Sequence, residues 1–145
     1  MSPDSSIPLD VAKRAQPESL RGRSLSLSLT VKDLRKSVTW YRDVMGFTLD
    51  QEYEREGTLR AVALKAGTVR ILLNQDDGAK GWDRVKGEGF SFQITTVQDI
   101  DELAHRIRTS GGRLATEPAD MPWGVRMFRI QDPDGFKLAI SSEKG

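Results

Sequence analysis

The strongest constraint on the fold is an internal repeat, in which the signals that start and end helices recur at one spacing. Asp33 and Asp99 each precede a run of apolar residues at helical spacing, and they lie 66 residues apart. Gly46 and Gly112, which are placed to end these two runs, are also 66 residues apart. Asp before and Gly after such a run are common start and stop signals of helices. The sequence therefore predicts two similar halves.

Strands are predicted on both sides of each helix. Alternating apolar and polar residues at Ser24–Leu29 and Phe90–Ile94 predict a half-buried strand before each helix. In both halves the last two strands form a hairpin, with turns at 65–68 and 132–135. The predicted later strands are 47–53, 59–64 and 69–73 in the first half, and 113–116, 125–130 and 136–141 in the second. The predicted class is therefore α+β.

Composition divides the chain into an arm and one domain. Residues 1–22 are rich in Ser, Pro and charged residues, which predicts a flexible N-terminal arm with a short helical stretch at 10–15. The domain is predicted at 23–145. Its first module covers about 23–75 and its second about 89–142, and a polar linker with three glycines joins them at 76–88.

The residue counts exclude several classes of site. The chain has no cysteine, which rules out disulfides, thiolate zinc sites and cysteine nucleophiles. Its one histidine, His105, lies within the second predicted helix and is expected to be solvated there.

The charge balance and hydropathy indicate where the protein works. Lys plus Arg number 22 and Asp plus Glu 21, so the net charge attracts neither nucleic acid nor an anionic membrane. No apolar run approaches the ~20 residues of a membrane span, and residues 1–15 do not resemble a secretory signal. We therefore expect a soluble, cytoplasmic protein.

Three segments resemble a known superfamily. Val31–Leu34 and Trp40–Phe47 resemble the opening of the vicinal oxygen chelate superfamily, which includes glyoxalase I, bleomycin-resistance proteins and extradiol dioxygenases. Asp132–Gly135 resembles its closing hairpin, and Trp123–Gly124 resembles the loop before that hairpin. The likeness covers about residues 24–142. It implies two tandem βαβββ modules whose curved mixed sheets surround a cavity, with the helices on the outer faces.

The resemblance also implies where a catalytic metal would bind. In metal enzymes of this superfamily the ligands occupy four strand positions that face the cavity and are usually His, Glu or Gln. Here those positions hold Ser26, Leu72, either Gly89 or Ser91, and Ala139. A slip of two residues reaches only the amides Gln93 and Asn74. Divalent catalytic metals need imidazole or carboxylate donors, so we expect no metal and no other cofactor.

Strand alternation predicts which side chains line the cavity. Leu25, Leu27 and Leu29 are expected to pack on the helices, which leaves the neighbouring serines to face the cavity. The same parity places in the cavity Arg60, Val62, Leu64, Arg70, Leu72 and Asn74 from the first half, and Ser91, Gln93, Met127, Arg129, Lys137, Ala139 and Ser141 from the second. The predicted wall is therefore a mixture of small polar, apolar and cationic groups.

Two features of this wall have alternative interpretations. The cations either bind an anionic group of a ligand or reach water at the strand ends. Trp82 and Trp123 either form a lid over the cavity and stack on a flat ligand, or pack within their loops or at a dimer contact. Trp40 is expected in the core. The predicted ligand-binding residues are Ser26, Arg60, Arg70, Leu72, Ser91, Gln93, Trp123, Arg129 and Ala139.

The favoured function is a metal-free protein, similar to the bleomycin-resistance branch, that binds an aromatic or antibiotic-like small molecule, anionic if the cations face it. The alternative is a lyase, isomerase or dioxygenase with a divergent or metal-independent site, although no cavity-facing Asp, Glu or His supplies a general base. A third hypothesis is an interaction module whose arm contacts a partner. The resemblance further implies a homodimer.

Overall fold

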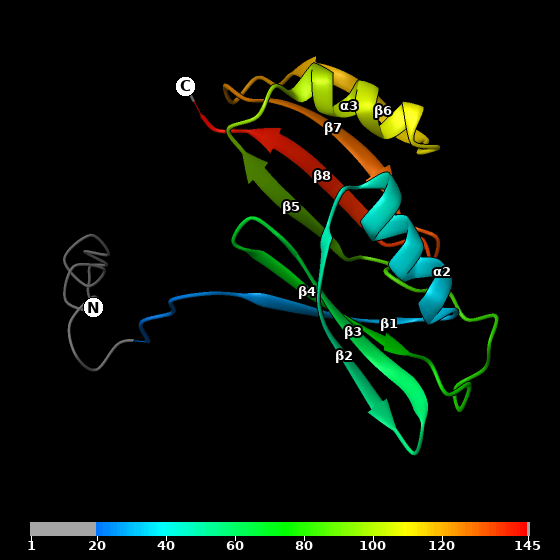
Figure 1. Ribbon diagram of the computed structural model, residues 1–145. Helices are drawn as coiled ribbons and strands as arrows, with labels where there is room; N and C mark the ends of the chain where they lie inside the picture. Colours follow the sequence, from blue (N-terminus) through cyan, green and yellow to red (C-terminus); the bar gives the residue numbers. More distant parts are fainter. Residues whose placement is uncertain (1–19, 145) are drawn as a thin grey trace, which may run out of the picture.

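The computed structural model describes residues 20–144 and contains one four-stranded mixed sheet in each half (Figure 1). The first sheet comprises β1 (Ser26–Val31), β2 (Thr48–Arg55), β3 (Thr58–Ala66) and β4 (Val69–Gln75), in the order β1-β4-β3-β2. The second comprises β5 (Ser91–Thr96), β6 (Leu114–Asp120), β7 (Arg126–Gln131) and β8 (Lys137–Ser142), in the order β5-β8-β7-β6. In both sheets the first strand pairs in parallel with the last. The predicted α+β fold of two repeated modules is confirmed.

Each module carries its helix after its first strand, as predicted. Helix α2 (Leu34–Thr39) continues into a π-helical turn, η1 (Trp40–Val44), and α3 (Ile100–Thr109) occupies the same place in the second module. The side chain of Asp33 accepts a hydrogen bond from the Lys36 amide at 3.2 Å, and Asp99 accepts one from Glu102 at 3.0 Å. These are N-caps, because a carboxylate satisfies an amide that has no partner within its own helix. No helix in the described part of the chain is long and apolar enough to span a membrane.

One hydrophobic core joins the two modules. Its buried members come from the inner face of each sheet and from both helices, and include Val31, Leu64, Ile71, Tyr41, Ile107, Phe128, Ile130 and Leu138. The ring of Tyr41 packs edge-on against Phe47, with 5.5 Å between ring centroids, and edge-on against Trp40 at 4.8 Å. Trp40 is partly buried against the core, as expected. The two modules therefore contribute to one continuous hydrophobic cluster.

A buried hydrogen bond fixes the first module to the closing hairpin of the second. The hydroxyl of Tyr41 donates to Asp132 Oδ2 at 2.7 Å. The other oxygen of Asp132 accepts from the amides of Asp134 and Phe136, each at 2.9 Å. Burial raises the pKa of Asp132, and burial together with the negative charge of Asp132 raises the pKa of Tyr41. Tyr41 is therefore held as a neutral phenol that donates its proton to the hydrogen bond with Asp132.

The linker between the modules is tied to the end of β4 by a buried ion pair. Lys86 Nζ lies 2.5 Å from Asp76 Oδ2, and both side chains are 5% exposed. Asp76 also accepts a hydrogen bond from the Gly78 amide at 2.9 Å, and Arg84 lies 3.6 Å from the same carboxylate. Hydrogen bonding from Lys86 lowers the pKa of Asp76 to about 2. The linker is therefore anchored to the first module close to where it leaves the sheet.

The first strand differs from its prediction at its beginning. Leu29 is buried and Leu27 is partly buried against the core, but Leu25 is 79% exposed. The strand begins only at Ser26, so Leu25 lies before the paired residues and has no neighbouring strand or helix to cover it. The helical stretch predicted at 10–15 lies outside the described residues.

We predict that Tyr41→Phe lowers the free energy of unfolding by about 1–3 kcal/mol, because it leaves a buried carboxylate oxygen without its donor. Urea unfolding measures the change. Tyr53→Phe is the matched control, since Tyr53 is 39% exposed and its hydroxyl only receives a 3.5 Å contact from Arg70. The control should change stability by less than about 0.5 kcal/mol. Equal effects of the two substitutions would contradict the role of this hydrogen bond.

We also predict that acid weakens the contribution of Asp76 to stability. Its pKa in the folded protein, about 2, lies below the ordinary value of 3.8. Ionised Asp76 therefore stabilises the fold fully above about pH 4, and this stabilisation is lost as the pH falls from about 4 towards 2. The difference in unfolding free energy between the wild type and Asp76→Asn should be largest near neutral pH and shrink over that interval. In a Lys86→Met background the same difference should depend less on pH, and an unchanged dependence would contradict the assignment.

Candidate functional site

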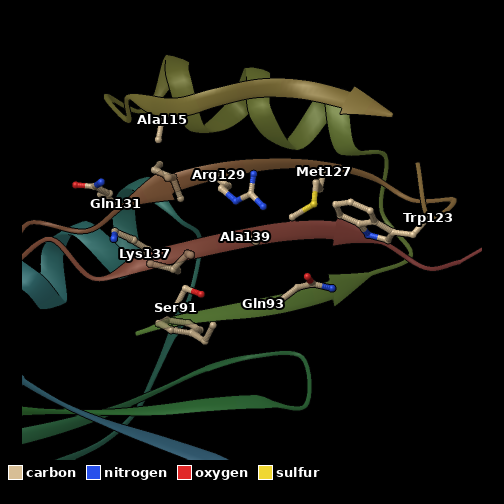
Figure 2. A pocket seen from close by; sticks show the side chains of 12 residues that line it. Ser91, Gln93, Ala115, Trp123, Met127, Arg129, Gln131, Lys137 and Ala139 are labelled. Atoms are coloured by element: carbon tan, nitrogen blue, oxygen red, sulfur yellow. The ribbon is translucent and has the colours of Figure 1, made fainter. Parts of the chain in front are cut away.

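The face of the second sheet that points away from the helices and the shared core forms a pocket with a volume of about 320 Å³ (Figure 2). We call this side of either sheet its outer face. Strands β5, β7 and β8 form its floor, and the loop between β6 and β7 contributes its one tryptophan. Its lining residues are Ser91, Phe92, Gln93, Ala115, Trp123, Met127, Arg129, Ile130, Gln131, Lys137, Leu138 and Ala139. Five residues of the predicted ligand-binding set are thus brought together: Ser91, Gln93, Trp123, Arg129 and Ala139.

Strand register explains how these side chains come to share one face. Arg129 lies opposite Ala139, which lies opposite Gln93 on its other side. Two residues earlier on β8, Lys137 lies opposite Gln131 on β7 and opposite Ser91 on β5. Because side chains alternate between faces, Phe128, Ile130, Leu138 and Ile140 lie on the other side and pack in the core. The register agrees with the alternation predicted for the second module, but Ser141, which was predicted to line the cavity, is fully buried and does not line this pocket.

Two cations of the pocket have no carboxylate partner among the described residues. Arg129 projects from β7 at the centre of the face, and Lys137 projects from the start of β8. Neither takes part in an ion pair or a side-chain hydrogen bond that neutralises it within residues 20–144. Outside the sheet ladder, the one hydrogen bond that Arg129 makes to another described residue joins its backbone amide to Thr116 Oγ1 at 2.9 Å. The pocket therefore presents positive charge that nothing nearby balances.

Trp123 bounds one end of the pocket. Figure 2 shows its ring beside Met127, near the end of β8. The side chain is 53% exposed, so one face of the indole is open to solvent. Trp82, the other predicted lid residue, does not line this pocket. Its ring instead covers Gly78, where an added Cβ would lie 2.4 Å from an indole carbon.

On the first sheet, one predicted face is wrong. Val62 lies opposite Leu73, and Leu64 lies opposite Ile71, so both face the core. Arg60 has the same parity as Val62 and therefore does not share a face with Leu72. The register places Ala61, Ala63 and Lys65 on the outer face of β3 instead. The error arose because the start of β3 cannot be placed to one residue from alternation alone, and a shift of one residue reverses every side chain.

The remaining first-sheet residues lie apart from the pocket. Ser26, Arg70 and Leu72 share the outer face of the first sheet and do not line the pocket on the second. Arg70 is also neutralised, because its Nε lies 3.2 Å from Asp50 Oδ2. Asn74 donates to Ser28 Oγ at 2.7 Å and is likewise occupied. Whether this face contributes to binding stays a prediction.

Several lining residues were absent from the predicted ligand-binding set. Parity predicts that Lys137 and Met127 face the cavity, but the predicted ligand-binding set does not include them. Gln131 could have been found in the same way, since it lies two residues after Arg129 on one strand. Ala115 follows an irregular part of β6, where the pairing shifts between Leu114 and Thr116, so alternation gives no signal for it.

The residues at the four implied ligand positions do not fit a divalent metal. Leu72 and Ala139 have no donor atom, and Ser26 and Ser91 offer only neutral hydroxyls. Within residues 20–144 no group of three or more His, Cys, Asp or Glu side chains could hold a metal ion. The cation Arg129 lies directly opposite Ala139, where it would repel a metal. His105 is exposed on α3, outside the sheets.

A larger groove, of about 730 Å³, lies between the modules, but it has a different character. It is lined by the β3–β4 turn, by residues that follow the first helix, and by α3 and β5, including Phe47, Val69, Ile94, Leu103, Arg106 and Ile140. None of the predicted ligand-binding residues lines it. We therefore take the smaller pocket, which gathers five of those residues, as the candidate site.

Comparisons with known proteins agree with this architecture. A probable lactoylglutathione lyase of Synechocystis sp. is 31% identical over 122 residues, which cover 80% of this chain and 92% of that protein. The lactoylglutathione lyase of Salmonella typhimurium is 26% identical over 128 residues, covering 84% and 93%. Among solved structures, TioX from Micromonospora sp. ML1 matches with a TM-score of 0.67 at 24% identity, covering 83% of this chain and 98% of that one. At that identity the structural match shows the fold alone.

The chain also matches a sequence family over most of its length. Residues 23–140 match the family described as Glyoxalase/Bleomycin resistance protein/Dioxygenase superfamily. This range covers both sheets, both helices and the closing hairpin, except for the last two residues of β8. The chain therefore belongs to the glyoxalase/bleomycin resistance protein/dioxygenase superfamily.

Proposed function

We propose that this protein binds a flat, anionic small molecule in the pocket of the second sheet, and that it does so without a catalytic metal. The observation that carries the proposal is the position of Arg129. Its cation, which has no carboxylate partner among the described residues, lies opposite Ala139. Ala139 occupies one of the positions where metal-dependent relatives are expected to carry a side chain that binds the metal. The guanidinium of Arg129 thus supplies a positive charge near the place where a metal ion would supply it in those relatives.

The cations and their polar neighbours suit an acidic group. A guanidinium offers a planar set of donors that matches a carboxylate, and the ammonium of Lys137 lies on the same face two residues from Ala139. Gln93 adds an amide and Ser91 a hydroxyl along the neighbouring strand. Arg129 remains exposed until a ligand covers it. Displacing water from these charges would strengthen the attraction between the protein and an anion.

The apolar part of the pocket suits a flat ring. Trp123 presents a partly exposed indole at one end, and the side chains of Met127 and Ala139 add apolar surface beside the polar groups. The volume of about 320 Å³ lies at the lower end of the ~300–1,000 Å³ typical of ligand pockets. An aromatic acid of one or two rings would fill it, with the ring beside Trp123 and the carboxylate near Arg129.

We predict that the protein binds 2-naphthoate more tightly than neutral 2-naphthol. Arg129→Gln should weaken naphthoate binding about 10- to 100-fold, since a hydrogen bond to a charged group contributes about 1.5–3 kcal/mol, and should leave naphthol binding nearly unchanged. Lys137→Gln should act in the same direction but less strongly. Isothermal titration calorimetry measures both ligands.

Arg70→Gln is the matched control for this experiment. Arg70 also projects from the outer face of a sheet, but Asp50 already neutralises it. Its replacement should not alter naphthoate affinity if the second sheet alone supplies the anion site. If Arg129→Gln weakens naphthol as much as naphthoate, or if naphthoate does not bind at all, the proposal is wrong.

A second candidate function is a lyase, because relatives up to 31% identical are called lactoylglutathione lyases. A lyase activity would need either a metal held by other donors or acid–base chemistry without a metal.

We predict instead that nickel, zinc, iron and manganese each fail to bind stoichiometrically after purification without chelator, as measured by elemental analysis. We also expect no turnover of lactoylglutathione with or without added metal. One equivalent of tightly held metal, together with turnover that a chelator abolishes, would favour the lyase.

The expected homodimer and cytoplasmic location stay predictions.

A further inference from the structure

We propose that Arg126, which lies outside the pocket, is a positioning residue for ligand binding, because its ion pairs hold the loop that carries Trp123. The inference rests on the proposed function in that it assigns Trp123 a role in binding. It goes beyond that function by assigning control of the tryptophan to a cluster of three charged residues, Asp101, Asp120 and Arg126.

The cluster encloses the loop at both of its ends. Asp120 is the last residue of β6 and Arg126 is the first residue of β7, and the two lie opposite each other in the sheet. Residues 121–125 form the turn between them, with Trp123 at its centre. Arg126 Nη1 lies 3.1 Å from Asp120 Oδ1, so the ion pair joins the two strands at the base of the turn.

The same guanidinium also ties the loop to the helix. Arg126 Nε lies 2.8 Å from Asp101 Oδ2, and Nη2 lies 3.0 Å from Asp101 Oδ1, which is a two-point contact to the first turn of α3. The backbone amide of Arg126 donates to Ser142 Oγ at 2.9 Å, at the end of β8. Arg126 therefore joins three strands and one helix at the point where the Trp123 loop leaves the sheet.

Inside the loop, backbone hydrogen bonds make the turn compact. The amide of Met121 donates to the carbonyl of Val125 at 2.7 Å, and the amide of Gly124 donates to the carbonyl of Met121 at 3.1 Å. Gly124 has φ +94°, a conformation that few other residues adopt. A compact turn moves as a unit, so the contacts at its base set where the indole lies.

The indole itself has little else to hold it. Trp123 is 53% exposed, and no hydrogen bond or ring contact fixes it within the described residues. Its position over the pocket therefore depends on the base of the loop. Removing the cluster would leave the ring free to sample other positions, and a ligand would then have to order it on binding.

The chain offers a matched control pair. Arg108 forms an ion pair with Glu117, which likewise joins α3 to β6. The side-chain exposures are similar, 42% and 72% for this pair against 37% and 58% for Arg126 and Asp101. The Arg108–Glu117 pair does not flank the Trp123 loop, so it separates a general effect on helix packing from an effect on the tryptophan.

The experiment measures 2-naphthoate affinity and the quenching of Trp123 fluorescence by acrylamide, with the signal of the matching Trp123→Phe protein subtracted. Arg126→Gln should increase quenching of Trp123 and weaken naphthoate binding by about 3- to 10-fold, the cost of ordering one side chain. Arg126→Lys should give an intermediate result, because an ammonium cannot make the two-point contact to Asp101. Arg108→Gln should change neither quantity.

Coupling to Trp123 distinguishes positioning from a general structural role. In a Trp123→Ala background, Arg126→Gln should cause no further loss of affinity. An equal loss in both backgrounds, or unchanged Trp123 quenching in Arg126→Gln, would overturn the proposal. If the wild-type protein fails to bind naphthoate, the proposed function fails, and the quenching comparison still decides whether the cluster positions the tryptophan.

Discussion

The hydrogen bond from Tyr41 to Asp132 is the interaction on which the arrangement of the two modules depends. It joins residues 91 positions apart in the chain and lies within the core that both modules share. Asp132 also organises the turn between β7 and β8 through two backbone amides. The side chain of Asp134 then reaches back to the Lys32 amide at 2.7 Å, before the first helix. One turn therefore sets both the closing hairpin and its contact with the other module.

The position of that hairpin has a direct consequence for the pocket. Strands β7 and β8 supply Arg129, Lys137 and Ala139, and their register is set by the turn that Asp132 holds. A slip of one residue would turn these side chains into the core and bring Ile130 and Leu138 to the surface. The burial of Ile130 and Leu138 therefore keeps the cations outside. The register between β7 and β8 therefore determines both which side chains pack in the core and which charges face the pocket.

Much of this fold could be predicted because its signals are local. The caps at Asp33 and Asp99, the glycine at 46 and the turn at 132–135 are each encoded within a few residues, and the structure confirms them. Three strands of the second sheet were also predictable, since Phe92 and Ile94 alternate with polar residues and Phe128 and Ile130 flank Arg129. The strand predicted at 113–116 instead continues to Asp120. The face of β3 was not predictable. Ala61, Val62, Ala63 and Leu64 are all apolar, so their pattern carries no parity, and only pairing with β4 selects the buried pair.

The sequence by itself determined that the chain has two α+β modules and that the residues at the four implied metal positions carry no imidazole or carboxylate, because caps, turns and residue identity are local properties. Tertiary structure alone decided which cations remain unpaired. Arg70 and Arg129 both project from an outer face, yet Asp50 on β2, two strands away from β4 in the same sheet, neutralises Arg70, and no described carboxylate reaches Arg129. That difference depends on the order of the strands in the sheet, which brings together side chains 20 residues apart in the chain. Charge balance is a property of neighbours in space, so it could not be established before the strands were paired.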